Sequence, residues 1–295
     1  MRGNSGRPAS GNDQVGSASE ALPYIRRFAG SIFVIKHGGN AIADTLMDEQ
    51  AALESFARDV VLLASVGIKP VVVHGGGPQI GAMLGRLGIQ SQFVGGLRVT
   101  DSATLEVARM VLMGKVNPEM VGAINKFAPL AIGLSGADAG LIVAAQAAGD
   151  LGFVGDVKSV APDLILRLLD QGLIPVVASV AVDDEGQAFN INADTVAGAL
   201  AGAISAEKLI YLTNVEGIYS RYPDSSSLIR QANSKDLAEL LDGDTVSQGM
   251  IPKLRSCLKA LEAGVESVHI LDGRTEHSLL LEIFTDLGIG TMVTR

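Results

Sequence analysis

The chain has 295 residues, of which 47% are hydrophobic and 19% charged, and this balance predicts a folded protein with a substantial core. Its net charge of −9 argues against nucleic-acid partners, because non-specific binding to nucleic acid depends on a basic surface. A single cysteine excludes an internal disulfide, and four scattered histidines show no spacing typical of a metal site.

The N-terminal segment is expected to lie outside the main body of the fold. Residues 1–17 are rich in glycine, serine and asparagine, so we expect them to be mobile, and they lack the apolar core of a signal peptide. No apolar run reaches the roughly 18 residues of a membrane span, so we expect a cytoplasmic protein without a membrane contact. Residues 18–30 have helical spacing and end in glycine, which predicts a short helix that packs on its own subunit or on a neighbour.

The sequence IFVIKHGGN, residues 32–40, reads as a buried strand that runs into a glycine loop. Four consecutive apolar residues are typical of a strand that is covered on both faces. Lys36 stands where the strand should end, and Gly38 and Gly39 follow it, so backbone N–H groups and a positive charge would face an anion such as phosphate. The alternative interpretation is an ordinary glycine turn beside a solvated lysine.

A second strand and glycine loop follow a long helix that the apolar periodicity predicts at 46–66. The sequence KPVVVHGGGP, residues 69–78, ends in proline, which is favoured at a first helical position. The loop is therefore directed at a helix N-terminus, where free N–H groups and the helix dipole favour an anion. Arg98 follows in a tight turn, just before a helix expected at 101–112.

Strands and helices alternate through the middle of the chain. Strand-like runs are expected at 131–134, 141–145 and 174–180, and a helix at 163–171 precedes the last of them. This alternation predicts an α/β fold with a largely parallel sheet that is covered by helices on both faces.

Polar residues mark the start of an alanine-rich helix that is expected to run to about residue 204. The sequence FNINAD, residues 189–194, offers more polar side chains than a helix cap needs, so Asp194 is a candidate functional residue. A strand at 208–212 and a helix at 234–241 follow. Lys253 then stands at the start of the next helix, and a strand at 267–271 and a helix from about residue 276 complete the chain.

Three common catalytic motifs are missing from the sequence. There is no G-x-x-x-x-G-K-[S/T] string, which excludes a Walker-type nucleotide site. Neither glycine loop has the G-x-G-x-x-G spacing with an acidic residue at the right distance, which argues against a dinucleotide dehydrogenase. Residues 133–137, GLSGA, lack the final glycine of a nucleophile elbow, so a serine hydrolase is not expected.

The remaining parts suit phosphoryl transfer, whose catalysis consists mainly of positioning and of neutralising negative charge. Lys36 and Lys253 could stabilise the transferring group from two sides. Asp194 would repel a phosphate, so its expected role is to hold the two lysines through charge-assisted hydrogen bonds. Each lysine alone could also be a solvated surface charge.

Five motifs, taken together, resemble those of the N-acetylglutamate kinases in the amino acid kinase family. They are VIKHGGN (34–40), HGGGP (74–78), GLRVT (96–100), NINAD (190–194) and GMIPK (249–253). The similarity runs from about residue 18 to residue 293, and the order and spacing of the motifs agree. The resemblance implies an open αβα sandwich around a mainly parallel central sheet, with two lobes that share this sheet.

The resemblance also implies a reaction and roles for individual residues. ATP would phosphorylate the γ-carboxylate of N-acetyl-L-glutamate to an acyl phosphate, a step of arginine biosynthesis. Lys36 and Lys253 would stabilise the transition state, Asp194 would organise them, and Mg²⁺ would arrive on the ATP phosphates without a metal site in the protein. The planar fork of Arg98 suits the α-carboxylate of the substrate. The other implied positions are the substrate-binding residues Gly76, Gly77 and Asn190 and the phosphate- or ATP-binding residues Gly38, Gly39 and Gly217.

Two further segments resemble the arginine-inhibited, hexameric branch of the family. The N-terminal helix with Tyr24 corresponds to an arm that interlaces dimers into a hexamer, a trimer of dimers. The C-terminal segment corresponds to the binding site of the inhibitor L-arginine, with Glu282 as a partner for its guanidinium group. The other arginine-site residues that the resemblance implies are Tyr24, His277, Gly288 and Gly290. An ordinary amphipathic helix is the alternative interpretation of this segment.

The resemblance implies three parts of the chain. Residues 1–29 would form the mobile N-terminus and the interlacing helix, residues 30–204 the acetylglutamate-binding lobe, and residues 205–295 the ATP-binding lobe with the arginine site.

The chain departs from the family pattern at three positions. His37 stands where relatives carry tyrosine or leucine, Ala137-Asp138-Ala139 replaces Lys-Asp-Gly, and Asn214 replaces a frequent aspartate. Two alternatives therefore stay open. One is a kinase for a related acid such as an aminoadipate derivative, and the other is a weak or silent arginine-sensing subunit.

Overall fold

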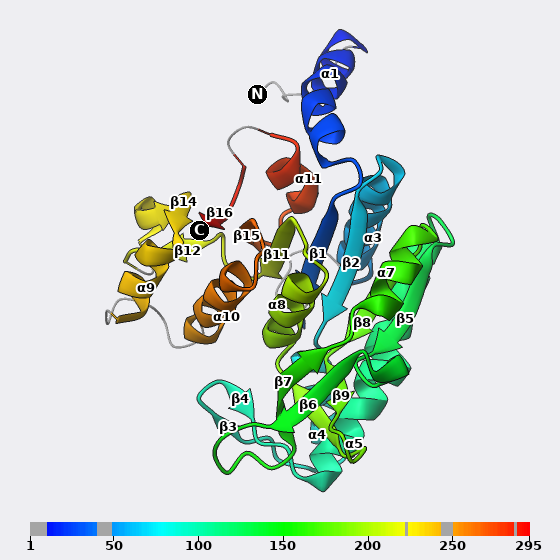
Figure 1. The fold of residues 1–295 in the computed structure, drawn as a ribbon, viewed down its shortest axis with the longest axis vertical. Coiled ribbons are helices and arrows are strands. Elements are labelled where there is room, and N and C mark those ends of the chain that lie inside the picture. Colours follow the sequence, from blue (N-terminus) through cyan, green and yellow to red (C-terminus); the bar gives the residue numbers. More distant parts are fainter. Residues whose placement is uncertain (1–10, 40–48, 222–223, 243–249, 286–287) are drawn as a thin grey trace, which may run out of the picture.

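The computed structural model describes residues 11–39, 49–221, 224–242, 250–285 and 288–295. Its central sheet contains β1 (Ile32–His37), β2 (Lys69–His74), β5 (Ala131–Ser135), β8 (Ile174–Ala178), β11 (Lys208–Thr213), β14 (Gln231–Asn233), β15 (Ser267–Asp272) and β16 (Thr291–Thr294). The strand order is β14-β16-β15-β11-β1-β2-β8-β5 (Figure 1). Neighbouring strands are parallel except for β15 and β16, so the prediction of a mainly parallel sheet is confirmed.

Helices cover both faces of this sheet, because alternate side chains of its inner strands enter two different cores. Along β1, Phe33 and Ile35 pack with one core and Val34 with the other. The first core includes α3 (Glu49–Ser65), α6 (Asn117–Asn125) and α11 (Ser278–Ile283). The second includes α7 (Asp163–Asp170), α8 (Ala193–Ala203), α9 (Ser234–Asp242) and α10 (Ile251–Glu262).

A small group of strands lies beyond one end of the main sheet. It consists of β6 (Ile142–Gln146), β7 (Val154–Val160), β9 (Val180–Val182) and β10 (Ala188–Ile191), whose pairings close on themselves (Figure 1). Two predictions were wrong here. The run at 174–180 is divided between β8 and β9, and FNI at 189–191 is a strand rather than the opening of α8. The buried Phe189 and Ile191 flank the less buried Asn190, which is the two-residue period of a strand.

The helix that was expected at 101–112 continues further than predicted. It begins as α5 (Ser102–Val111), passes through a π-helical turn at Leu112–Val116 and continues as α6. The Asp101 carboxylate caps α5 by accepting the N–H of Thr104 at 2.7 Å. Pro118, the second residue of α6, follows directly on the π-helical turn, where the α-helical hydrogen-bond pattern is already altered.

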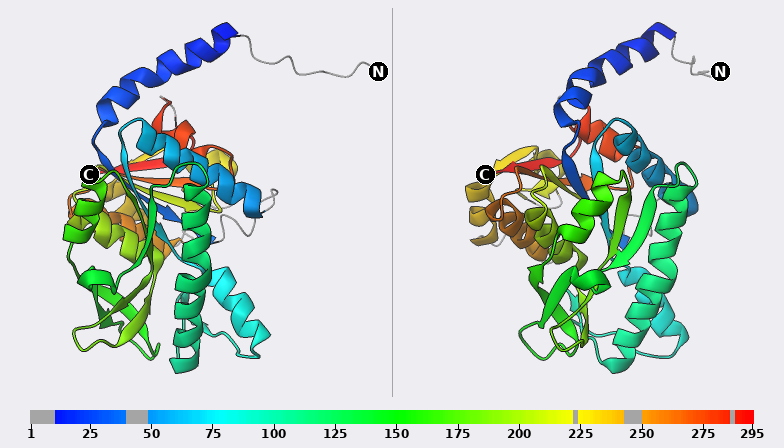
Figure 2. Two further views of the ribbon diagram at one scale, coloured as in Figure 1. Left: turned by 90° about the vertical axis from the view of Figure 1, so that its right-hand side faces the viewer. Right: turned by 45° about the vertical axis from the view of Figure 1, so that its right-hand side comes forward.

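Helix α1 (Gly11–Phe28) extends away from the body of the molecule in both views of Figure 2. It starts at Gly11, so it includes residues 11–17 that the composition predicted to be mobile, while residues 1–10 lie outside the described part. Its last turn packs on the body, where the Phe28 ring meets Phe33 edge-on at 5.3 Å. Within the described ranges, no helix combines the length and the apolar character that a membrane crossing needs.

Candidate active site

A cleft of about 610 Å³ opens at the carboxyl ends of β1, β2 and β11. Ligands of open α/β sheets bind at this edge. The N-termini of α8, α10 and α4 (Gly77–Arg86) contribute residues to its lining, and so does the hairpin of β3 (Phe93–Val94) and β4 (Leu97–Arg98). Three helix N-termini add partial positive charge, which favours an anionic ligand.

Most of the residues that the sequence marked as catalytic, substrate-binding or phosphate-binding meet in this cleft. They are Lys36, Gly38, Gly39, Gly76, Gly77, Arg98, Asn190, Asp194 and Lys253. Gly217 is not among the described lining residues, although Thr213, Asn214 and Val215 just before it are. Tyr24, His277, Glu282, Gly288 and Gly290 also lie away from the described lining.

The Asp194 carboxylate joins the two lysines of the cleft. Its Oδ1 lies 2.8 Å from Lys36 Nζ, and its Oδ2 lies 2.7 Å from Lys253 Nζ. These three residues come from β1, the first turn of α8 and the first turn of α10. Two cations share one anion, so the group carries one excess positive charge toward the cleft.

Burial and the neighbouring opposite charges shift the pKa values of these groups in opposite directions. Burial by itself would raise the pKa of Asp194, but Lys253 and Lys36 outweigh it and hold that pKa well below its ordinary value. Burial lowers the pKa of Lys36, although Asp194 opposes the shift. The Asp194 carboxylate is thus kept ionised by its two partners.

A second set of contacts, which the sequence did not reveal, fastens the start of α8 to α10. The backbone carbonyl of Asp194 accepts the hydroxyls of Ser256 at 2.8 Å and Tyr211 at 3.2 Å. Asn192 provides the helix cap through Oδ1, 2.7 Å from the Asp194 nitrogen, which leaves the Asp194 side chain for the lysines. A Cβ on Gly198 would lie 2.9 Å from Ser256 Oγ, so glycine permits the close helix approach.

The first glycine loop differs from the prediction that its N–H groups face a ligand. The Gly38 N–H donates to the Leu212 carbonyl at 3.1 Å and is therefore already used. A Cβ on Gly38 would lie 2.7 Å from that same oxygen. Glycine is required here because strands β1 and β11 remain in close contact just beyond their paired residues.

Replacing Gly38 by alanine is therefore expected to lower kcat by about tenfold to 100-fold, because the end of β1 that carries Lys36 must shift. Steady-state kinetics would measure the loss. The matched control is Gly85→Ala on the exposed side of α4, where a Cβ meets nothing within 4 Å and kcat should be unchanged. Equal kcat for the two variants would contradict this interpretation.

Arg98 is held at the rim of the cleft by three contacts. Its Nη2 donates to the Gly77 carbonyl at 2.9 Å, its Nη1 donates to Ser91 Oγ, and its guanidinium carbon lies 4.7 Å from the centre of the Phe93 ring. Asn190 approaches from β10, with Nδ2 donating to Thr100 Oγ1 at 3.4 Å. The two side chains therefore flank the cleft from the hairpin and from the small group of strands.

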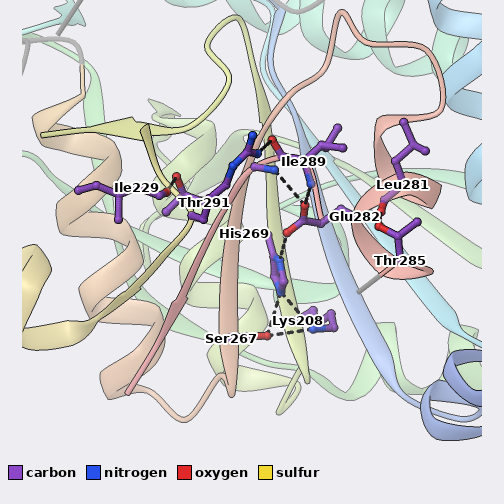
Figure 3. Close-up of polar contacts among 11 residues, drawn as sticks. Lys208, Ile229, Ser267, His269, Leu281, Glu282, Thr285, Ile289 and Thr291 are labelled. Atoms are coloured by element: carbon purple, nitrogen blue, oxygen red, sulfur yellow. Dashed lines mark hydrogen bonds and ion pairs between the residues drawn. The ribbon is translucent and has the colours of Figure 1, made fainter. Parts of the chain in front are cut away.

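The predicted arginine-site residue Glu282 lies in a buried polar network on another part of the fold (Figure 3). Its Oε1 lies 2.7 Å from His269 Nδ1, and its Oε2 accepts the N–H groups of Ile289 at 2.7 Å and Gly290 at 3.0 Å. Lys208 continues the network, 3.1 Å from His269 Nε2. The structure thus brings Glu282 and Gly290 together, with Gly288 beside the same carboxylate.

The other two predicted arginine-site residues have partners of their own. His277 Nδ1 lies 2.6 Å from the buried Asp59 carboxylate of α3. Tyr24 packs partly buried against the core under α1. Sequence spacing could not reveal that His277 faces α3, because the two residues are far apart in the chain.

The residues that depart from the family pattern lie in defined surroundings. Asp138 accepts the N–H and the hydroxyl of Ser135, and Ala139, at the position of the family glycine, has a φ of +51°. Burial, Lys36 and His74 lower the pKa of His37 to about 3, so this ring is neutral. Asn214 lines the cleft.

Known proteins resemble this chain over most of its length. Residues 31–272 match the model of the amino acid kinase family. The chain is 51% identical over 284 residues to the acetylglutamate kinase of Acaryochloris marina, covering 96% of this chain and 98% of the relative. It is 52% identical to the acetylglutamate kinase of Saccharopolyspora erythraea, covering 93% and 90%.

Solved structures show the same fold. An N-acetylglutamate synthase from Neisseria gonorrhoeae, complexed with coenzyme A and N-acetyl-glutamate, matches with a TM-score of 0.84 at 28% identity over 95% of this chain and 63% of the synthase. The same synthase with coenzyme A and L-arginine matches with a TM-score of 0.80 at 30% identity, over 95% of this chain and 65% of the synthase. A carbamate kinase from Giardia lamblia, bound to AMP-PNP, shares the fold with a TM-score of 0.66 at 17% identity, over 90% and 99% of the two chains.

Proposed function

The chain belongs to the amino acid kinase family, and from that premise we propose that it phosphorylates the γ-carboxylate of N-acetyl-L-glutamate with ATP. The observation that carries this proposal is the pair of lysines joined by Asp194 at the wall of the cleft. Relatives named acetylglutamate kinase match over nearly their whole length and support the choice of substrate. The product is an acyl phosphate, which belongs to arginine biosynthesis.

In this reaction an oxygen of the γ-carboxylate attacks the γ-phosphorus of ATP, and the bond to the ADP oxygen breaks. Negative charge spreads over the transferring phosphoryl group, and Lys36 and Lys253 stabilise it from the protein side. Asp194 keeps both ammonium groups in position before the substrates arrive, so little reorganisation is needed during the reaction. No proton transfer is required, because the attacking carboxylate is already ionised.

The magnesium ion of the reaction is proposed to arrive on the ATP phosphates. Among the described residues that line the cleft, Asp194 is the only carboxylate, and both its oxygens are paired with lysines. The described part of the chain also holds no group of three or more metal-binding side chains. The described residues of the cleft thus offer no carboxylate set for Mg²⁺, whose chemistry when bound would be to neutralise charge on the nucleotide.

Substrate recognition is proposed to depend on Arg98 and Asn190. Replacing Arg98 by lysine should raise the KM for N-acetylglutamate by about tenfold or more, because a point charge replaces a planar fork that matches two carboxylate oxygens. The effect on kcat should be smaller. Initial rates over a range of substrate concentrations would separate the two parameters, and an unchanged KM would place the α-carboxylate elsewhere.

The direct test is an assay with ATP, Mg²⁺ and N-acetylglutamate, in which hydroxylamine traps the acyl phosphate as a hydroxamate. A panel of related acids, including an aminoadipate derivative, would identify a different acceptor. The silent arginine-sensing alternative predicts arginine binding in calorimetry without any hydroxamate. Failure to form hydroxamate from any acid would overturn the kinase assignment.

We further propose that residues 30–204 bind acetylglutamate and that residues 205–295 bind ATP. The strand order supports this division, because β14, β16, β15 and β11 form one half of the sheet and β5, β8, β2 and β1 form the other. The cleft lies where β1 and β11 meet. A hexamer of interlaced dimers and inhibition by arginine are part of the same proposal, supported by the projecting helix α1 and by the similarity to the synthase solved with L-arginine.

Deletion of residues 1–20 tests this regulatory part, because it removes the projecting half of α1 and keeps Phe28, whose ring packs on the body. We expect the truncated enzyme to keep its kcat without arginine, to form smaller oligomers and to need a higher arginine concentration for half inhibition. Light scattering and activity against arginine concentration would measure these effects. Unchanged inhibition would exclude a role of this segment in arginine control.

A further inference from the structure

His74 is a buried side chain with a contact that the proposed reaction has not used. It is the last residue of β2, is only 1% exposed and does not belong to the described lining of the cleft. Its Nδ1 lies 3.0 Å from the carbonyl oxygen of Gly75, the next residue in the chain. The ring therefore lies behind the second glycine loop and contacts that loop's backbone.

The buried side chain of Asn117 determines which nitrogen of His74 carries the proton. Asn117 Nδ2 lies 2.9 Å from His74 Nε2 and 2.9 Å from the Val176 carbonyl oxygen on β8. A carbonyl oxygen can only accept, so the amide nitrogen must face Val176, and its second N–H is then donated to His74 Nε2. Nε2 is thus an acceptor, and the single proton of the neutral ring is on Nδ1.

His74 stays neutral under ordinary conditions. Burial lowers its pKa to about 4, although the Gly75 carbonyl opposes the shift. A neutral ring with its proton on Nδ1 donates one hydrogen bond, to the Gly75 carbonyl, and accepts one from Asn117.

This hydrogen bond orients the peptide that joins Gly75 to Gly76. In a planar trans peptide the C=O and N–H groups point in opposite directions. When the Gly75 carbonyl is held toward His74, the Gly76 N–H must point away from the ring and toward the cleft that Gly76 lines. A Cβ on Gly76 would lie 2.8 Å from Leu112 Cδ2, so Leu112 packs closely against the loop on that side.

We propose that His74 and Asn117 are positioning residues, which hold the Gly75–Gly76 peptide so that the Gly76 N–H, assigned above to substrate binding, donates instead to an anionic oxygen of the transferring phosphoryl group. This inference rests on the proposed kinase function and deepens it. It adds His74 and Asn117 to the residues that affect the reaction. Neither contacts the substrate, and both act through the Gly76 N–H group. The plain alternative is a buried histidine whose hydrogen bonds stabilise the fold without affecting the chemistry.

Two variants of His74 separate these possibilities. The amide nitrogen of asparagine reaches the position of Nδ1, so His74→Asn keeps the donor to Gly75, whereas the amide of glutamine reaches the position of Nε2, so His74→Gln loses it. We expect His74→Gln to lower kcat by about tenfold to 100-fold, because a preorganised donor is misdirected, and to change KM little. His74→Asn should keep kcat within about fivefold of the wild type, since it loses only the contact with Asn117.

Thermal unfolding of both variants checks for a merely structural role, because both lose a buried contact and both should be destabilised. Equal kcat values for the two variants would overturn the proposal, whatever their stabilities. A solid-state NMR spectrum of the wild-type protein labelled with ¹⁵N-histidine identifies the tautomer of His74 without an activity assay. The protein has only four histidines to assign. A proton on Nε2 of His74 would also overturn the proposal. If the wild-type enzyme forms no hydroxamate, the proposed function fails first, and this is seen before any variant is compared.

Discussion

Replacing Lys36 by alanine should lower kcat by about 10²–10³-fold and leave the KM for N-acetylglutamate nearly unchanged. The Lys36 ammonium group is expected to interact with charge that develops on the phosphoryl group during transfer, and an interaction made mainly in the transition state affects kcat rather than substrate binding. Initial-rate measurements at saturating ATP would give both constants. A variant with a raised KM and a normal kcat would show that Lys36 binds the substrate instead.

A matched control is available on the neighbouring strand. Lys69 on β2 also pairs with an aspartate, since its Nζ lies 3.0 Å from Asp170 Oδ1, but both side chains are exposed. Lys69→Ala removes the same number of charges without touching the cleft and should leave kcat unchanged. A similar loss of kcat in both variants would indicate a general effect of net charge rather than a role of Lys36 in the reaction.

Replacing Asp194 by asparagine should be the most disruptive single change in both activity and stability. The side chain keeps its shape, but Lys36 and Lys253 lose the only carboxylate between them. Removing one partner of a buried ionic group typically costs about 3–5 kcal/mol in the free energy of unfolding. Denaturant unfolding would measure this loss, and the hydroxamate assay should show little remaining product.

The pH dependence of this stability difference follows from the direction of the pKa shifts. The native pKa of Asp194 lies below its unfolded value, so its ionised form stabilises the protein fully above the ordinary aspartate pKa of about 4. That contribution is lost as the pH falls from there toward the native pKa. The stability of wild type and Asp194→Asn should therefore differ at neutral pH and converge in acid.

In the Asp194→Asn variant, Lys36 causes a second dependence of stability on pH. Burial and Lys253 lower the pKa of Lys36 in the native protein, and Asp194 opposes this shift, so the pKa of Lys36 should fall further in the variant. A folded-state pKa below the unfolded value makes stability rise with pH. The asparagine variant should thus regain part of its stability as the pH is raised above neutrality. The exposed control Asp170→Asn should lose at most about 1 kcal/mol.

Much of the fold followed from local patterns in the sequence. Apolar runs at 32–35 and 71–73 marked the inner strands β1 and β2, because a strand buried on both faces has no polar period. Glycine and proline marked the loop that starts α4. These signals arise from the conformational limits of single residues, so they can be recognised in the sequence without knowledge of the fold.

Local patterns failed where a partner far along the chain decides the outcome. The residues FNI at 189–191 became β10 because β7 and β9 pair with them. The Gly38 N–H, which looked free for a ligand, is taken by Leu212. Tyr211 and Ser256 gave no signal, since their common acceptor is the backbone carbonyl of Asp194.

Local sequence patterns thus predicted the fold class and the residue types of the proposed phosphoryl-transfer site, Lys36, Asp194 and Lys253 among them. The three-dimensional structure was needed to show that one carboxylate meets both lysines at 2.8 and 2.7 Å, and that the buried His74 ring contacts the Gly75 carbonyl. The physical reason is that these distances depend on the register of parallel strands and on how closely α8 packs on α10. Both are set by packing between segments far apart in the chain, which no single stretch of sequence contains.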